Sequence, residues 1–141
     1  MLKKCLFYLL MMPSLFLNTN AAQFGWSKND ICRSNSLEIK GSIESGDAAK
    51  FSNFLKKSQT EYEEQGCPKS GIFAEPYLYA SVSLNSNGGD VKESMKIGYL
   101  IREREWQTFV YPNKICMSSC VFILAAGVFR QASLGKVGIH K

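Results

Sequence analysis

The sequence predicts an α/β domain with a mainly parallel sheet. Segments in which apolar residues alternate with polar ones, as in strands, are followed along the chain by segments with apolar residues at helical spacing. Strands separated by helices are joined by right-handed crossovers, which makes neighbouring strands parallel. The chain has 141 residues, of which 45% are hydrophobic and 21% charged, so it suits one domain with a core of its own.

The first 22 residues predict a signal peptide. Two lysines precede an apolar run over residues 5–17, and small residues follow it, ahead of a cut after Ala22 or Ala21. The run of about 13 residues is shorter than the roughly 20 that span a bilayer, and a proline interrupts it. An uncleaved anchor is the alternative. We therefore expect an exported protein, periplasmic or secreted, whose mature domain is residues 23–141.

The elements of the mature domain follow from periodicity and from turn residues. Asp47 and Asp90, or a neighbour of the latter, are expected to cap helices, and Gly127 is expected to end one. The four predicted strands cover residues 37–43, 77–84, 107–111 and 136–140, and the three predicted helices cover 47–66, 91–101 and 118–126.

Cysteine usage agrees with export. Beyond the leader four cysteines remain, an even number. Three pairings are open, and we favour Cys32 with Cys67 and Cys116 with Cys120, because each pair flanks or lies within one local segment. Zinc is the alternative use of four cysteines, but the sequence has no Cys-x-x-Cys pair and a single histidine, so no metal is expected.

The charge argues against nucleic acid as a partner. The formal net charge of the whole chain is +5, and removal of the leader with its two lysines lowers it to +3. Nucleic-acid-binding proteins usually carry a concentrated basic face, and no run of Lys and Arg provides one here.

Three segments are expected at the carboxyl ends of strands, where ligands of parallel sheets bind. They are the loop 85–89, the turn 116–119 and His140. A serine at a helix start lies beside unpaired amides that can stabilise an oxyanion, paired glycines allow close backbone approach, and a histidine can act as general base. Each feature also has a plain structural interpretation: a helix-capping serine, an ordinary turn and a solvent-facing histidine.

Three motifs resemble those of a known family. The run Leu-Asn-Ser-Asn-Gly-Gly-Asp-Val at 84–91 is similar to the N-S-x-G-G segment of the Clp peptidase subunit and of the wider Clp/crotonase superfamily. Residues 118–127 resemble that family's nucleophile helix, and Gly138-Ile139-His140 resembles the strand that delivers its histidine. The resemblance extends over residues 36–141 and implies a ββα superhelix. The leader and the Cys-x-Ser-x-Cys setting are similar to a group of exported Clp peptidase-like bacterial proteins.

The resemblance implies an exported serine peptidase-like protein that hydrolyses peptide bonds through an acyl-enzyme, without a cofactor. It makes Ser118 the nucleophile, with Ser119 as the alternative, and His140 the general base. The oxyanion donors would be the amides of Ser119 and of Gly88 or Gly89. Substrates would be peptides or unfolded proteins, no ATPase partner is expected outside the inner membrane, and full-length relatives would form homo-oligomers.

The family's third catalytic residue, an acid beyond the histidine, has no counterpart before the last residue, Lys141. We therefore expect a chain truncated at its C-terminus, and a minimal enzyme with a Ser/His dyad is the other explanation. Loss of the orienting acid can lower kcat by about 10⁴-fold, so the sequence leaves the activity of this short form open. Two further functions remain open: a non-catalytic binding or scaffold protein on the same fold, and an acyl-thioester enzyme like the crotonases.

Overall fold

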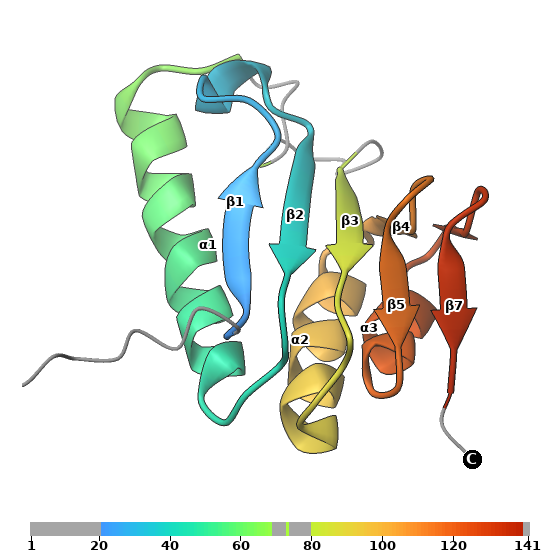
Figure 1. The fold of residues 1–141 in the computed structure, drawn as a ribbon. Helices are drawn as coiled ribbons and strands as arrows, with labels where there is room; N and C mark the ends of the chain where they lie inside the picture. The colour runs from blue at the N-terminus through green and yellow to red at the C-terminus, as the bar shows by residue number, and fades with distance from the viewer. Residues whose placement is uncertain (1–20, 69–72, 74–79, 140–141) are drawn as a thin grey trace, which may run out of the picture.

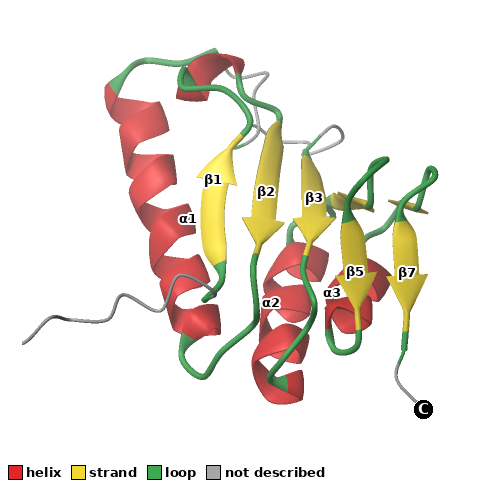
Figure 2. Cartoon of the chain, in the orientation of Figure 1, coloured by secondary structure: helices red, strands yellow, loops and turns green. Residues whose placement is uncertain are grey.

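The computed structural model describes residues 21–68, 73 and 80–139 and confirms an α/β domain (Figures 1 and 2). A five-stranded sheet has the order β1-β2-β3-β4-β6, and β5 and β7 form a second sheet. The strands are β1 (Gln23–Trp26), β2 (Ser36–Lys40), β3 (Ser81–Asn85), β4 (Gln107–Phe109), β5 (Ile115–Met117), β6 (Arg130–Gln131) and β7 (Lys136–Gly138). The helices are the 3-10 helix η1 (Ile31–Arg33), α1 (Asp47–Glu64), α2 (Val91–Glu103) and α3 (Cys120–Ala126).

The large sheet is mixed, which corrects the expectation of a mainly parallel sheet in one respect. The pairs β2–β3, β3–β4 and β4–β6 are parallel, as are β5 and β7. The pair β1–β2 is antiparallel, and the sequence did not predict β1 at all. The short connection between β1 and β2 allows this pairing, because an antiparallel neighbour needs no crossover helix.

The core lies between the large sheet and the three helices. Leu37 and Ile39 of β2 and Val82 and Leu84 of β3 are fully buried, while the residues between them turn to the other face of the sheet. This is the expected alternation. The helices contribute the fully or almost fully buried side chains Phe51, Leu55, Ile97, Ile101 and Ile123.

Several element boundaries differ from the prediction. The cap of α2 is Asp90, whose carboxylate accepts a hydrogen bond from the Glu93 amide at 2.9 Å, as expected. The cap position of α1 is Gly46 rather than Asp47, because the Asp47 carboxylate accepts from the Glu44 amide at 2.7 Å and contributes to the first turn of the helix. The second and fourth predicted strands extend into residues 77–79 and 140, which lie outside the described residues.

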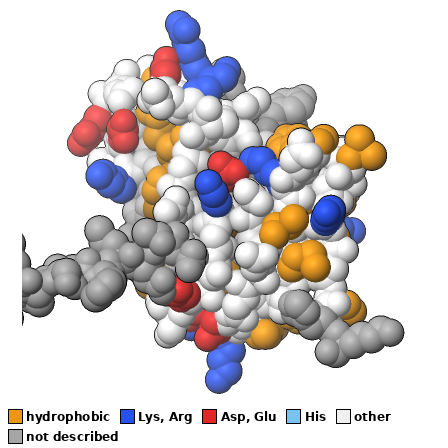
Figure 3. Space-filling model, in the orientation of Figure 1, with side chains coloured by type: hydrophobic (Ala, Val, Ile, Leu, Met, Phe, Trp, Pro, Cys, Tyr) orange, Lys and Arg blue, Asp and Glu red, His pale blue; other side chains and the backbone are white. Residues whose placement is uncertain are grey.

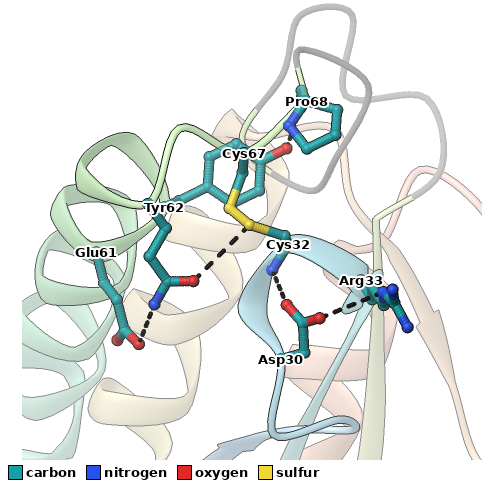
Figure 4. Close-up of a disulfide and its surroundings, with 8 residues drawn as sticks. Asp30, Cys32, Arg33, Glu61, Tyr62, Cys67 and Pro68 are labelled. Carbon is teal, nitrogen blue, oxygen red and sulfur yellow. Dashed lines mark hydrogen bonds and ion pairs between the residues drawn. A yellow bond between two sulfur atoms is a disulfide. The ribbon is translucent and has the colours of Figure 1, made fainter.

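The cysteines pair as favoured, Cys32 with Cys67 and Cys116 with Cys120. The first disulfide joins η1 to the segment after α1 (Figure 4). Two neighbouring contacts hold its ends: the Asp30 carboxylate accepts from the Cys32 amide at 3.0 Å, and the Tyr62 hydroxyl donates to the Pro68 carbonyl. Two disulfides fit an oxidising compartment.

The expected signal peptide lies almost wholly outside the described residues. Of it, the structure describes Ala21, which bridges to Ser42, and the buried Ala22, and β1 begins directly after them at Gln23. Within the described part of the chain, no helix is both long enough and apolar enough to cross a membrane.

The face shown in Figure 3 carries both signs of charge, scattered among neutral side chains. Apolar side chains gather on the right of this view, on the side of β5 and β7. The strongly exposed apolar residues include Leu134 and Ile139, which flank β7 and are 90% and 78% exposed.

Candidate active site

The turn between β5 and α3 places Ser118 in an uncommon backbone conformation. Its φ is 54°, in the left-handed region that residues other than glycine rarely adopt. Two hydrogen bonds hold the turn: the Ser118 amide donates to the Gly138 carbonyl at 2.8 Å, and the Val121 amide donates to the Ser118 carbonyl at 3.1 Å. The left-handed residue explains why α3 begins at Cys120 and not at Ser118 as predicted.

The two serines of this turn have different surroundings. Ser119 is 2% exposed, and its hydroxyl is hydrogen-bonded to that of the buried Ser94 on α2, with 2.9 Å between the oxygens. Ser118 is half-buried, and in the part of the chain that the structure describes its hydroxyl makes no hydrogen bond. Ser119 occupies the cap position of α3 without a capping hydrogen bond from its side chain, so the helix-capping interpretation is wrong for Ser119.

The glycine loop after β3 lies directly against this turn. Gly88 has a φ of 85°, and a Cβ on it would lie 2.8 Å from the Ser119 nitrogen and 2.9 Å from the Ser118 Cβ, and would clash with the Met117 carbonyl oxygen. Real side chains do not approach that closely, so only glycine fits here. The structure thus brings together two of the three segments that the sequence singled out.

Backbone hydrogen bonds fix the glycine loop on both sides. Ser86 pairs with β5, since its amide donates to the Ile115 carbonyl at 2.8 Å and its carbonyl accepts from the Met117 amide at 2.9 Å. On the other side, the Ile43 amide donates to the Gly88 carbonyl at 2.9 Å. These bonds hold the glycine loop between β5 and the segment that follows β2.

The amides near Ser118 differ in availability. The Gly88 amide already donates to the Ser86 hydroxyl at 3.0 Å. The amides of Gly89 and Ser119 donate no hydrogen bond to any group among residues 21–68, 73 and 80–139. Within that part of the chain, the Ser119 amide of the serine turn and the Gly89 amide of the adjoining loop are therefore open to an oxyanion.

His140 lies outside the described residues, so the predicted serine–histidine contact is not tested. Gly138, whose carbonyl accepts from the Ser118 amide, precedes the histidine by two positions in the sequence. Among the described residues, no group of three His, Cys, Asp or Glu side chains is arranged to hold a metal ion.

Two supporting residues were not predicted. Ser94 interrupts the apolar face of α2, three residues before the buried Ile97, and a polar residue on an apolar face is the signal that could have identified it. Glu93 accepts from the Ala48 amide at 2.9 Å and so joins the starts of α1 and α2. The Lys96 ammonium, at 2.7 Å, and then the Ala48 amide hold the pKa of Glu93 below its ordinary value of 4.5.

Comparison with known protein families gave no match, and comparisons with curated proteins and with solved structures gave no significant similarity.

Proposed function

We propose that the protein is an exported serine hydrolase that cleaves peptide bonds with Ser118 as its nucleophile. The observation that carries this proposal is the conformation of Ser118, a left-handed residue on a sharp turn between a strand and a helix, with a half-buried hydroxyl free of partners in the described part. In α/β-hydrolases the nucleophilic serine is likewise presented on a sharp, strained turn from a strand to a helix. A buried serine with a hydrogen-bonded hydroxyl, such as Ser119, is poorly placed for attack.

The chemistry would proceed through an acyl-enzyme. The Ser118 hydroxyl attacks the substrate carbonyl carbon while a general base takes its proton, the same group then returns the proton to the leaving amine, and water releases the acyl group. The resemblance to the Clp/crotonase superfamily assigns the base to His140. The amides of Ser119 and Gly89 are the favoured oxyanion donors, because the Gly88 amide would first have to leave the Ser86 hydroxyl.

The repeated order of elements supports a ββα superhelix as the finer description of the fold. β4 in the large sheet is followed by β5 in the second sheet and then by α3. In the two preceding repeats an isolated β-bridge takes the place of the second strand. After β3, Ser86 bridges to Cys116 and α2 follows; after β2, Ile43 bridges to Gly89 and α1 follows. Each turn of such a superhelix places a loop at the same edge, which is where Gly88 and Ser118 meet.

The substrate class and the location follow from the same proposal. The expected leader and the two disulfides favour a periplasmic or secreted protein. Outside the cytoplasm no ATP-driven unfoldase would deliver folded proteins, so the substrates are short peptides or unfolded chains. No cofactor takes part in the proposed reaction.

A fluorophosphonate probe tests the nucleophile. We expect it to label the wild-type protein at Ser118, to leave Ser118→Ala unlabelled and to label the matched control Ser119→Ala. His140→Ala should slow labelling by about 100- to 10,000-fold, the usual contribution of a general base. Absence of labelling in folded wild-type protein would overturn the proposal in favour of a binding or scaffold protein, and labelling at Ser119 would move the nucleophile by one position.

A further inference from the structure

We propose that the Cys116–Cys120 disulfide is a positioning element that holds Ser118 in its reactive conformation. The inference rests on the proposed function, because it concerns the orientation of the proposed nucleophile. Cys116 is the middle residue of β5 and Cys120 is the first residue of α3, so the bond joins the strand to the helix across the turn that carries Ser118. Ser118 is the central one of the three residues enclosed.

Few other hydrogen bonds hold Ser118 itself. Its left-handed conformation is intrinsically unfavourable for an L-residue and persists only where surrounding structure imposes it. Within the described part, the Ser118 backbone is held by one hydrogen bond to Gly138 and one from Val121, and the Ser118 hydroxyl adds none. The disulfide keeps the Cα atoms of Cys116 and Cys120 5.2 Å apart, which limits how far the turn can relax.

The two disulfides differ in a way that separates positioning from general stabilisation. The bond between Cys32 and Cys67 closes a loop that contains β2 and the whole of α1, whereas that between Cys116 and Cys120 closes a loop of five residues. The entropy that a disulfide removes from the unfolded chain grows with the loop, so the short one stabilises the fold less by this route.

The burial of the two disulfides also favours a positioning role for the one between Cys116 and Cys120. Cys116 and Cys120 are both fully buried, whereas Cys32 and Cys67 are partly exposed near the end of α1 (Figure 4). The residues that the buried bond joins or encloses contact the rest of the site. Gly88 lies against Ser118 and Ser119, the Cys116 backbone forms a bridge with Ser86, and the Ser119 hydroxyl is hydrogen-bonded to that of Ser94. Loss of the bond should therefore change the conformation of the Ser118 turn more than that of any other segment.

The test compares two double variants of the full chain. Cys116→Ala with Cys120→Ala removes the buried bond, and Cys32→Ala with Cys67→Ala is the matched control. Fluorophosphonate labelling is measured as its inactivation rate constant and its reversible binding constant, each per folded molecule as judged by circular dichroism. A misplacement of about 1 Å at a reacting group can cost about 100-fold in rate. We expect a loss of that size in the rate constant of the first variant, with probe binding unchanged, and less than about twofold in the control.

Hydrogen exchange gives a second readout that is independent of labelling. The Ser118 and Val121 amides, which donate in this turn, should exchange faster in the first variant and at the wild-type rate in the control. If the first variant does not fold, the double variant Cys116→Val with Cys120→Ala is used in its place, because valine fills part of the space that the two sulfur atoms leave.

The outcomes distinguish the two proposals. Labelling of the first variant at the wild-type rate, or equal losses in both variants, would overturn the positioning role and leave the serine hydrolase intact. Absence of labelling in the wild-type protein would overturn the proposed hydrolase. If the turn amides of the Cys116→Ala, Cys120→Ala variant also exchange at the wild-type rate, the positioning role is overturned as well.

Discussion

Replacement of Gly88 by alanine should destabilise the protein strongly, because two costs coincide at this position. The residue has a φ of 85°, and left-handed backbone costs an L-residue about 1–2 kcal/mol. The new Cβ would also come within 3 Å of Ser118 Cβ and the Ser119 nitrogen, and the forced shift adds about 1–3 kcal/mol. We expect a loss of about 2–5 kcal/mol in the free energy of unfolding.

Gly46 provides the matched control, because its φ is 88° but nothing lies within 4 Å of the position of its Cβ. Gly46→Ala should therefore cost only the backbone part, about 1–2 kcal/mol. Urea unfolding followed by circular dichroism measures both variants, and the melting temperature should fall by about 4 °C for each kcal/mol. Equal losses in Gly88→Ala and Gly46→Ala would refute the close packing of the glycine loop on the serine turn.

Two further predictions concern the groups that support the site. Ser94→Ala leaves the buried Ser119 hydroxyl without its partner and should lower the free energy of unfolding by about 1–3 kcal/mol. The double variant Ser94→Ala with Ser119→Ala should lose less than the sum of the two single variants. Urea unfolding of the wild type and the three variants measures this cycle, and strict additivity would contradict the hydrogen bond. Because the pKa of Glu93 is lowered in the folded state, its carboxylate stabilises the fold above pH 4.5 and this contribution is lost as the pH falls through the folded pKa. The stability difference between the wild type and Glu93→Gln should accordingly be largest near pH 7 and shrink below pH 4.5 in thermal unfolding, and a difference independent of pH would exclude an ionised Glu93.

Local periodicity was a sound guide to the long elements of the fold. The helices α1 and α2 have apolar residues at helical spacing over three or more turns, and their ends agree with the prediction within a few residues. The strands β1, β5 and β6 have two to four residues, too few to show an alternation, and each exists because a neighbouring strand offers hydrogen bonds. The prediction missed them for that reason.

The sequence predicted which residues form the candidate site, but not their backbone conformations or hydrogen-bond partners. The glycine loop and the serine turn were identified as neighbours at one edge of the sheet, and the structure places Gly88 against Ser118 and Ser119. The motif favoured Ser118 over Ser119 as nucleophile, but its match to the family allows a slip of one residue. Their environments differ only through partners far along the chain, such as Ser94 for Ser119 and Gly138 for Ser118.

The sequence by itself determined the α/β class, favoured the cysteine pairing that the structure has, and identified the glycine loop and the serine turn, since these depend on local patterns and on residue types. The tertiary structure alone decided the antiparallel β1, the left-handed backbone of Ser118 and the buried hydroxyl of Ser119. These features arise from close packing and hydrogen bonding between residues distant in the chain, where the free energy of the whole fold outweighs the preference of each residue.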